Sequence, residues 1–338
     1  MEQSDGQAKN KTQELLIAWL SQPLSVIIIL ANIFLILGIL FNRKLHGTTN
    51  WCFLSLLFAD LLAGSALPCI PKLATEMNLK YYPCFFTYLT PNFLFLCLLA
   101  NLLVVHYAKY VCIIHPLHYQ ASWVYRWAFL YILLAWTAPL IFACLPLVWN
   151  QWGTNKNCSF KSVFPKPYLY LETYGLLIPS ILAMSFMCIQ ILWVARKHLK
   201  DIKNLLHSVT QSQAPSELEQ QLELRNVKSI ASASIIFLVC WVPYIVCLNI
   251  SLLATTPSVS QTIRTIVTCI GTGSAAAVPI ILSFGNHQYT QFWRDLATKV
   301  CQGCCQRWRC KQKQAQLNAS MPRENICMRE AHLREAPG

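Results

Sequence analysis

Charged residues are scarce in this sequence of 338 residues. Asp, Glu, Lys and Arg make up 12% of it, whereas a soluble domain carries about 25%. Hydrophobic residues make up 55%, and the mean hydropathy is +0.41. This shortage of charge excludes an ordinary water-soluble protein and indicates a membrane protein. A cleavable signal is also lacking, because residues 1–14 are polar and the apolar run that follows is long enough to stay in the bilayer.

Catalytic and metal-binding signatures are lacking as well. There is no Gly-rich phosphate loop, and no group of His and Cys residues has metal-ligand spacing on one helix face. Cys301, Cys304, Cys305 and Cys310 lie in a basic tail without the second CxxC pair of a zinc site. The sequence therefore predicts neither an enzyme nor a metal or other cofactor. Palmitoylation of Cys301, Cys304 and Cys305, beside the amphipathic stretch 289–300, is the use we expect for the tail cysteines.

Long apolar runs are what the sequence has in abundance. A bilayer core needs about 20 apolar residues per helix, and seven stretches meet this requirement. No internal repeat of the kind found in many transporters accompanies them. The predicted fold class is therefore an all-α membrane protein, a seven-transmembrane helix bundle with a short amphipathic cytoplasmic helix. The predicted spans are 15–41, 51–77, 84–114, 126–149, 168–195, 229–254 and 261–284.

The lysines and arginines indicate how the bundle is oriented. Most of them, and with them most of the net charge of +13, fall on the cytoplasmic side if the N-terminus lies outside. Attraction to anionic lipid explains this excess without a nucleic-acid partner. We therefore expect a multi-pass plasma-membrane protein with an extracellular tail (1–14) and a seven-span domain (15–284). The amphipathic helix and the cytoplasmic tail follow (285–338).

Two modifications are expected on the outer side. Cys84 opens the third span and Cys158 precedes the fifth, so both face the oxidising compartment, where disulfides persist. We predict a bond between them, with Cys69 near the outer end of the second span as a rival partner. Asn10 begins an Asn-Lys-Thr sequon in the N-terminal tail and is the predicted glycosylation site, whereas Asn157 abuts the predicted disulfide.

The sixth span contains the run Cys240–Pro243, with the sequence Cys-Trp-Val-Pro. A proline inside a helix removes a backbone hydrogen bond and bends the chain, and a membrane bundle tolerates this bend. The large ring of Trp241 can then swing as the helix straightens. This run resembles the kinked sixth helix of rhodopsin-like, class A G-protein-coupled receptors, which implies that Trp241 and Pro243 form a switch. An ordinary kinked membrane helix is the alternative.

The cytoplasmic end of the third span resembles the same family with a change. Those receptors carry Asp/Glu-Arg-Tyr there, and this chain has Ala108, Lys109 and Tyr110, followed by Pro116 and Leu117 at the family's spacing. The resemblance implies that Lys109, Tyr110, Pro116 and Leu117 take part in G-protein coupling. Lys109 keeps the charge but lacks the fork of donors, and Ala108 cannot form the usual ion pair, so raised basal activity is a hypothesis. A lysine snorkelling at the membrane edge is the alternative.

Two further positions depart from the class A pattern. The segment Val278–Leu282 lies where the family usually has Asn-Pro-x-x-Tyr, and only the proline remains. Asp60 matches the second-span pattern, and an acid inside a membrane is a functional hypothesis by default. Most of the oxygen ligands that help such an acid to hold sodium are absent. An ion site and a protonated or water-bridged Asp60 in contact with Ser274 both stay open.

Polar side chains in the outer half of the spans form a candidate ligand site. Tyr88, Asn92 and Phe95 are spaced i, i+4 and i+7, so they lie on one stripe of a helix. If the faces converge, they form an apolar pocket with a few hydroxyls, one amide and one carboxyl, which suits a large amphipathic ligand. Alternatively, Tyr88, Tyr244 and Ser251 satisfy one another between helices. The candidate ligand-binding residues are Tyr88, Asn92, Phe95, Glu172, Tyr244, Ser251 and Thr272.

Four blocks of sequence carry a closer resemblance. Residues 91–103, 164–172, 240–244 and 274–279 are similar to the family of G-protein-coupled bile acid receptors. The resemblance implies a receptor for bile acids or related steroids that couples to a stimulatory G protein and raises cyclic AMP. It also implies that the candidate residues line the steroid site. Glu172 and Tyr244 would hydrogen-bond a ring hydroxyl, while the acidic chain of the ligand points away from Glu172 towards the mouth.

Two alternatives remain beside this interpretation. Thr272 replaces a serine of the family, and such differences leave room for a class A receptor with another lipid or steroid ligand. A seven-span transporter or channel is an alternative from another class. It predicts paired broken helices or a polar pathway through the bundle, and the intramembrane charges are too few for that.

Overall fold

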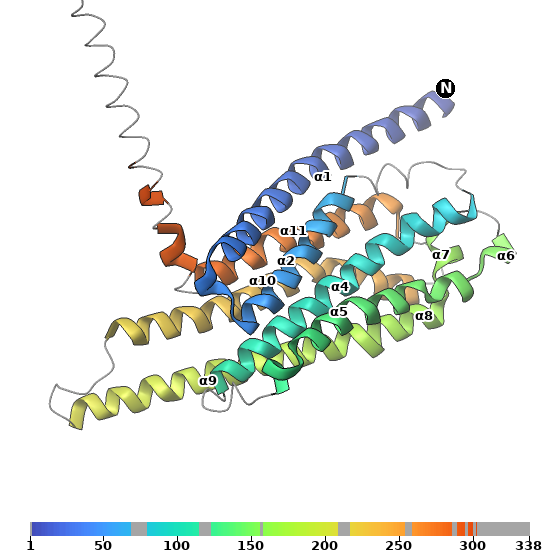
Figure 1. Cartoon of the computed structure of the whole chain (residues 1–338). Coiled ribbons are helices and arrows are strands. Elements are labelled where there is room, and N and C mark those ends of the chain that lie inside the picture. The colour runs from blue at the N-terminus through green and yellow to red at the C-terminus, as the bar shows by residue number, and fades with distance from the viewer. Residues whose placement is uncertain are drawn as a thin grey trace, which may run out of the picture. The chain divides into compact units, whose positions relative to one another are not determined.

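The structure is a computed structural model that describes residues 2–68, 80–114, 123–155, 158–208, 217–253, 259–285, 289–294, 297–299 and 302. Helices dominate these residues, and no strand occurs among them (Figure 1). In chain order the elements are α1 (Glu2–Phe41), the short 3-10 turn η1 (Arg43–Leu45), α2 (Thr48–Ala66), α4 (Tyr81–Ile114), α5 (Trp123–Val148), α6 (Trp152–Asn155), α7 (Phe160–Val163), α8 (Lys166–Tyr170), the π-helix η3 (Leu171–Leu177), α9 (Ile178–Ser208), α10 (Glu217–Leu253) and α11 (Gln261–Gly285).

Seven helical stretches among the described residues are long and apolar enough to cross a membrane. The predicted all-α, seven-span fold is therefore confirmed. The fifth span is composite, because α8, η3 and α9 follow one another without a break at Leu171 and Ile178, which keep right-handed helical dihedral angles. The spans are Ala18–Phe41, Thr48–Ala66, Tyr81–Ile114, Arg126–Val148, Lys166–Val194, Lys228–Leu253 and Thr262–Gly285.

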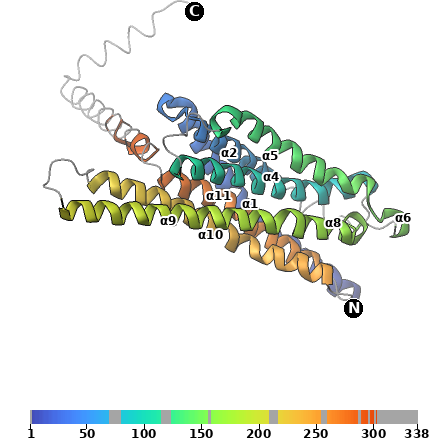
Figure 2. The same ribbon diagram turned by 90° about the horizontal axis from the view of Figure 1, so that it is seen from below.

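The spans form a closed ring with α4 at its centre. Contacts run from α1 to α2, α4, α9, α10 and α11 in turn, and α11 packs back against α1. The third span, α4, has 56% of its most apolar window buried, whereas the span in α5 has 17%. Figure 2 accordingly shows α5 at the edge of the bundle, packed on α4. A central α4 exposes one face to each neighbour, which is what a shared site between helices requires.

Buried polar side chains join neighbouring spans. Asn32 of α1 donates hydrogen bonds from Nδ2 to the carbonyl of Ala275 in α11, at 2.9 Å, and to the carbonyl of Ile28, at 2.8 Å. Ser55 of α2 donates to Asn101 of α4 at 2.6 Å and accepts from the ring N–H of Trp136 at 2.9 Å. Lipid offers no alternative partner for such groups, so these bonds hold the helices in one packing arrangement.

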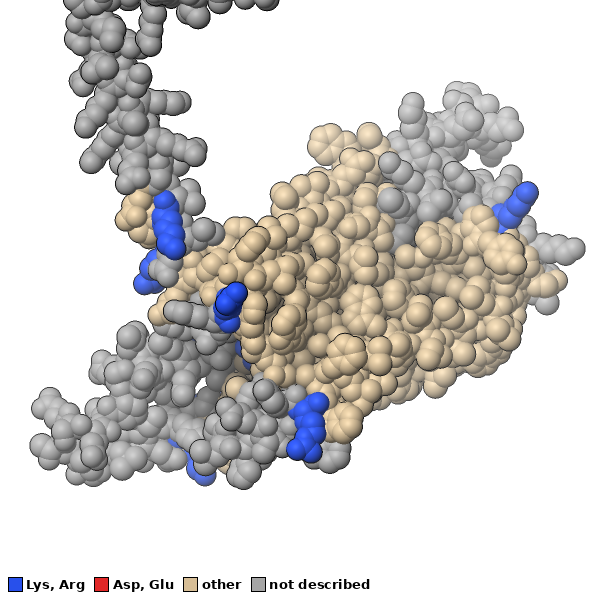
Figure 3. Space-filling view, in the orientation of Figure 1, with Lys and Arg blue, Asp and Glu red and all other residues tan. Residues whose placement is uncertain are grey.

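The outer surface of the bundle is apolar. Phe129, Ile141 and Val148 of α5 are 79%, 67% and 93% exposed. In Figure 3 the side of the bundle is a broad surface without Lys, Arg, Asp or Glu, and the basic side chains lie towards its ends. Large apolar side chains exposed around a helix bundle are expected where the neighbour is lipid.

Some boundaries differ from the predicted ones. The expected N-terminal tail is helical, because α1 begins at Glu2, and no proline interrupts the helix before Pro23. The second helix ends at Ala66 instead of continuing to residue 77, and residues 69–79 lie outside the described part of the chain. Residues 289–294 and 297–299 of the predicted amphipathic stretch are helical. Most of that stretch belongs to a second compact unit that starts at Thr290.

Candidate ligand-binding site

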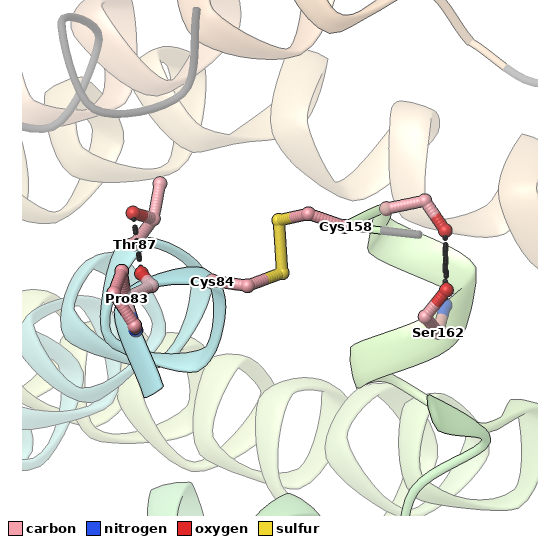
Figure 4. The surroundings of a disulfide bond; sticks show 6 residues. Pro83, Cys84, Thr87, Cys158 and Ser162 are labelled. Atoms are coloured by element: carbon pink, nitrogen blue, oxygen red, sulfur yellow. Dashed lines mark hydrogen bonds between the residues drawn. A yellow bond between two sulfur atoms is a disulfide. The ribbon is translucent and has the colours of Figure 1, made fainter. Parts of the chain in front are cut away.

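A disulfide closes one end of the bundle, called the disulfide end below. Cys84, in the first turn of α4, is bonded to Cys158, which lies just before α7 (Figure 4). The bond ties residues 158–165, the cap segment, to α4. The Ser159 hydroxyl accepts a hydrogen bond from the backbone N–H of Ser162 at 3.2 Å, and the two hydroxyls lie 2.7 Å apart (Figure 4). This N-cap starts α7 at Phe160.

Aromatic rings hold the cap segment against the helices. Phe160 and Phe164 pack edge-on against Tyr88 of α4, with ring centroids 6.2 and 6.4 Å apart. Phe164 also stacks on Tyr168 of α8 at 5.4 Å. Phe164, Tyr168 and Cys84 are buried in one apolar cluster. The cap segment therefore forms a packed roof at the disulfide end.

A cavity lies under this roof, bounded by α2, α4, α10 and α11. It holds about 890 Å³ of empty space, counted out to its open mouth. Small-molecule sites in proteins span about 300–1,000 Å³ and combine apolar walls with a few polar groups. Most of the wall here is aliphatic or aromatic, and the polar groups are hydroxyls, one amide and one guanidinium. The cavity thus has the size and chemistry of a site for an amphipathic ligand.

Most of the predicted ligand-binding residues line this cavity. The α4 stripe faces it as its spacing indicated, and α10 and α11 each add one predicted residue. Ser251 does not belong to the wall, and its hydroxyl donates to the carbonyl of Cys247 in its own helix at 2.8 Å. Glu172 also lies outside the wall. The predicted residues in the wall are Tyr88, Asn92, Phe95, Tyr244 and Thr272.

Tyr168 supports the wall from behind. Its hydroxyl accepts a hydrogen bond of 2.7 Å from Nδ2 of Asn92, and the ring is fully buried. The amide oxygen of Asn92 has no hydrogen-bond partner among the described residues, so it is free to accept one from a ligand. Tyr168 was not predicted as a site residue. Its spacing of i, i+4 from Glu172 is the signal that placed both on one helix face.

Glu172 is a buried carboxyl beside the cavity. It is 1% exposed, lies in the π-helix η3, and has no hydrogen-bond partner for Oε1 among the described residues. Tyr244 interacts electrostatically with it, which places the carboxyl behind that part of the wall. π-helical turns often occur at functional sites, and burying a carboxyl without partners is costly. Both features single out Glu172.

Arg264 is a wall residue that the sequence interpretation missed. It lies in the first turn of α11, is 8% exposed, and its guanidinium carbon is 3.5 Å from the centroid of the Phe160 ring. Nη2 donates to the hydroxyl of Ser251 at 3.3 Å, whereas Nε and Nη1 have no partner among the described residues. The signal was present in the sequence, because Arg264 is the one lysine or arginine of the predicted span 261–284.

Trp241 forms the floor of the cavity. Its ring is 2% exposed, lies 4.3 Å from that of Phe95 and 5.5 Å from that of Tyr244, and donates from Nε1 to the hydroxyl of Ser274 at 3.1 Å. A Cβ atom at Gly271 would lie 2.7 Å from this ring, so α11 passes unusually close to it. A ligand in the cavity would contact the same ring that contacts both α4 and α11.

Comparison with known proteins identifies the family. Residues 31–282 match the model of the 7 transmembrane receptor (rhodopsin family). The chain belongs to this rhodopsin family of receptors. It is 43% identical over 288 residues to the G-protein coupled bile acid receptor 1 of Oryctolagus cuniculus and 42% identical over 288 residues to that of Homo sapiens. Each alignment covers 84% of this chain and 86% of the relative. The adenosine receptor A2b of Rattus norvegicus is 23% identical over 317 residues, 86% of this chain and 93% of the relative.

Below the floor, the receptor holds the acid that raised two hypotheses. Asp60 is 2% exposed, and Oδ2 has no hydrogen-bond partner among the described residues. Ser274, the serine expected to contact it, accepts its hydrogen bond from Trp241 instead. Leu98, Ala275 and Val278 occupy the neighbouring positions as buried apolar residues. The arrangement offers Asp60 little help in holding a cation.

A second polar group joins three helices nearer the opposite end of the receptor. His106 of α4 is completely buried, and Nδ1 lies 2.8 Å from the carbonyl of Leu102. Nε2 is hydrogen-bonded to the hydroxyl of Ser234 in α10. The thiol of Cys188 in α9 lies 3.0 Å from the same hydroxyl. This His-Ser-Cys group links the helices at the level between the floor and the coupling residues, and the sequence interpretation did not identify it.

The predicted coupling residues are only partly described. Ala108 is fully buried, and Lys109 and Tyr110 are half-buried in the last two turns of α4. Pro116 and Leu117 lie outside the described residues. Val278 and Leu282, which replace the polar ends of the usual seventh-helix motif, are buried apolar residues. The half of the receptor that the family uses for restraint is thus held by apolar packing here.

The remaining predicted sites lie mostly where the chain is not described. These are the rival cysteine Cys69 and the tail cysteines Cys301, Cys304 and Cys305. Asn10 falls within α1, but its side chain is not described. No group of three or more His, Cys, Asp or Glu residues that could hold a metal ion occurs in the described ranges.

Proposed function

We propose that this receptor binds bile acids or related steroids, couples to a stimulatory G protein and raises cyclic AMP. The observation that carries the proposal is the cavity of about 890 Å³ at the disulfide end, with its apolar wall and few polar groups. A steroid with a polar side chain and ring hydroxyls has matching chemistry. The two relatives above that are named bile acid receptors align over most of their length, which supports the same assignment.

The polar wall residues suggest how a steroid is held. Asn92 offers an amide oxygen that has no partner among the described residues, and Tyr244 offers a hydroxyl beside it in the wall. Both are suited to a ring hydroxyl. Glu172 acts behind Tyr244, where it favours the orientation in which the phenol hydroxyl serves the ligand. Glu172 is in this sense a positioning residue.

Trp241 and Pro243 are proposed to pass the signal on. The ligand would rest on Trp241, whose ring packs against Phe95 and is hydrogen-bonded to Ser274. Pro243 lies in the same helix, and a proline bend is a natural hinge. Movement of α10 at this bend would change the surface near Lys109 and Tyr110, together with Pro116 and Leu117, for the G protein.

The proposed orientation places the disulfide end outside the cell. A disulfide persists in an oxidising compartment, and the ligand mouth opens at the same end. This puts the N-terminus outside with Asn10 as a glycosylation site, and the C-terminal tail in the cytoplasm with Cys301, Cys304 and Cys305 as palmitoylation sites.

Cyclic AMP in transfected cells tests the proposal. Cells that express the full chain with an N-terminal epitope are exposed to a panel of bile acids and to other steroids. A concentration-dependent rise in cyclic AMP with bile acids is expected. If no bile acid raises cyclic AMP although the epitope is detected on intact cells, the proposal is wrong.

A matched pair of tyrosines tests the site. Tyr244→Phe removes one hydroxyl from the wall, and Tyr174→Phe removes one from an exposed side chain of the fifth span that donates to Asn249 at 3.1 Å. We expect Tyr244→Phe to lower bile acid potency about 10-fold, as for loss of one hydrogen bond to ligand. Tyr174→Phe should leave potency unchanged. Equal effects of the two substitutions would show that the cavity is not the ligand site.

A further inference from the structure

Arg264 has an unusual position for a cation in a membrane protein. It is 8% exposed and lines the cavity at the disulfide end, between the cap segment and the helices. Arginines within spans are rare and generally have a charged partner or a functional role. Arg264 therefore needs either a partner in the protein or a task.

The protein supplies little of what the guanidinium requires. An arginine side chain carries five N–H donors, and here one contact is made, from Nη2 to the hydroxyl of Ser251 at 3.3 Å. Nε and Nη1 are buried without a partner, and no ion pair to Arg264 occurs among the described residues. The charged groups that interact with it are the phenols of Tyr244 and Tyr88, not a carboxylate. Burying a charge in this state is costly unless something else pairs with it.

The geometry holds the guanidinium ready for a ligand. Its carbon lies 3.5 Å from the centroid of the Phe160 ring, so the ring fixes the plane of the group. Phe160 is itself held by Tyr88 and Phe164 of the roof. A planar guanidinium with two free edges matches the two oxygens of a carboxylate or a sulfonate.

We infer that Arg264 recognises the anionic group of an amphipathic polycyclic ligand, a carboxylate or a sulfonate, and thereby sets the direction in which the ligand lies in the cavity. The inference rests on the proposed function, because it assumes a steroid-like agonist. The acidic end then lies at the disulfide end under Phe160. The ring system extends towards Trp241, with Asn92 and Tyr244 on its hydroxyl groups.

Binding of three ligands that share one ring system tests this role. The probes are a bile acid, its taurine conjugate and the corresponding uncharged bile alcohol. Binding is measured as the ligand-dependent rise in Tm of the purified full-length receptor in detergent, which does not depend on G-protein coupling. Potency in the cyclic AMP assay is measured beside it. The variants are Arg264→Gln, Arg264→Lys and, as a control, Lys166→Gln, which removes an exposed cation from the same end outside the cavity.

Arg264→Gln should weaken the bile acid and its taurine conjugate about 10- to 100-fold, as for loss of a charge-assisted pair, and the alcohol by less than about 3-fold. Arg264→Lys should keep part of the preference for the acids, because it keeps the charge but not the fork. Lys166→Gln should change none of the three ligands. Arg264→Gln should not lower the Tm of the ligand-free receptor, because no partner of the charge is lost with it.

Several results would overturn the inference. Equal weakening of acid and alcohol by Arg264→Gln, or a lower ligand-free Tm, would make Arg264 a structural residue. Unchanged binding of the acids in Arg264→Gln would remove Arg264 from the ligand site while leaving the proposed function intact. If the wild-type receptor binds none of the three ligands, the proposed function fails together with the inference. The difference between carboxylate and sulfonate shows which of the two anions Arg264 serves.

Discussion

Gly271 lies where α11 passes closest to the Trp241 ring, and a methyl group added there has a calculable effect. A Cβ atom would lie 2.7, 2.8 and 2.9 Å from three ring atoms of Trp241, nearer than real contacts allow. The ring has little room to retreat, because Phe95 lies 4.3 Å away on its other contact and Ser274 holds its Nε1. We therefore expect Gly271→Ala to force the ring or α11 to move.

The magnitude follows from two opposing terms. Overpacking a well-packed core costs about 1–3 kcal/mol, whereas replacing a helical glycine by alanine gains about 0.5–1 kcal/mol. Gly273→Ala, two residues along the same helix, isolates the gain, because its Cβ would lie 3.8 Å from Leu24, an ordinary contact. Gly273→Ala should thus raise the Tm slightly, and Gly271→Ala should lie about 1–3 kcal/mol below it in stability.

Thermal unfolding of the purified receptor in detergent measures both variants. The Trp241→Leu background provides the cycle, because it removes the ring atoms with which the new methyl group clashes. In that background Gly271→Ala should become as favourable as Gly273→Ala. If Gly271→Ala is as stable as Gly273→Ala in the wild-type background, or remains unfavourable without the ring, the close packing of α11 on Trp241 is refuted.

Three other predictions concern groups that shape or hold the site. Cys158→Ser frees the cap segment from α4, so agonist potency should fall more than 10-fold at pH 7, measured as cyclic AMP at equal surface expression, since the roof is then held by apolar packing alone; unchanged potency would mean that the roof does not need the bond. Tyr168→Phe leaves the amide N–H of Asn92 without its acceptor and should lower stability by about 1–3 kcal/mol. The cost of Tyr168→Phe should largely vanish in an Asn92→Leu background, and an equal cost in both backgrounds would contradict the bond. Asn32→Leu removes the hydrogen bond between α1 and α11 and should lower the Tm, which an unchanged Tm would refute.

Much of the fold could be predicted because the bilayer sets the length of each span. Seven apolar runs of sufficient length gave seven spans, and the predicted ends agree with the structure except at the outer end of the second span and the N-terminus. Hydropathy identifies which residues can enter the membrane. It does not identify where a helix continues beyond the membrane, and for that reason the helical start of α1 at Glu2 was missed.

The candidate site could be predicted only in part. Tyr88, Asn92 and Phe95 line the cavity because their spacing places them on one face of α4, and a regular helix keeps that spacing. The same reasoning put Glu172 in the wall, but the π-helix η3 changes the angular step per residue, and the carboxyl lies behind Tyr244. Spacing gives an angle around one helix, not the rotation of that helix within the bundle.

The sequence by itself determined the membrane class, the seven spans, the pairing that closes the disulfide end and the aromatic ring at the helix bend. These depend on local composition or on chemistry that few residues carry. Only the tertiary structure decided which side chains share a cavity. Arg264 is the plainest case, because whether an arginine one turn into a span faces lipid headgroups or a ligand depends on its neighbours. Phe160 above it and Ser251 beside it come from other parts of the chain, and folding alone brings the three together.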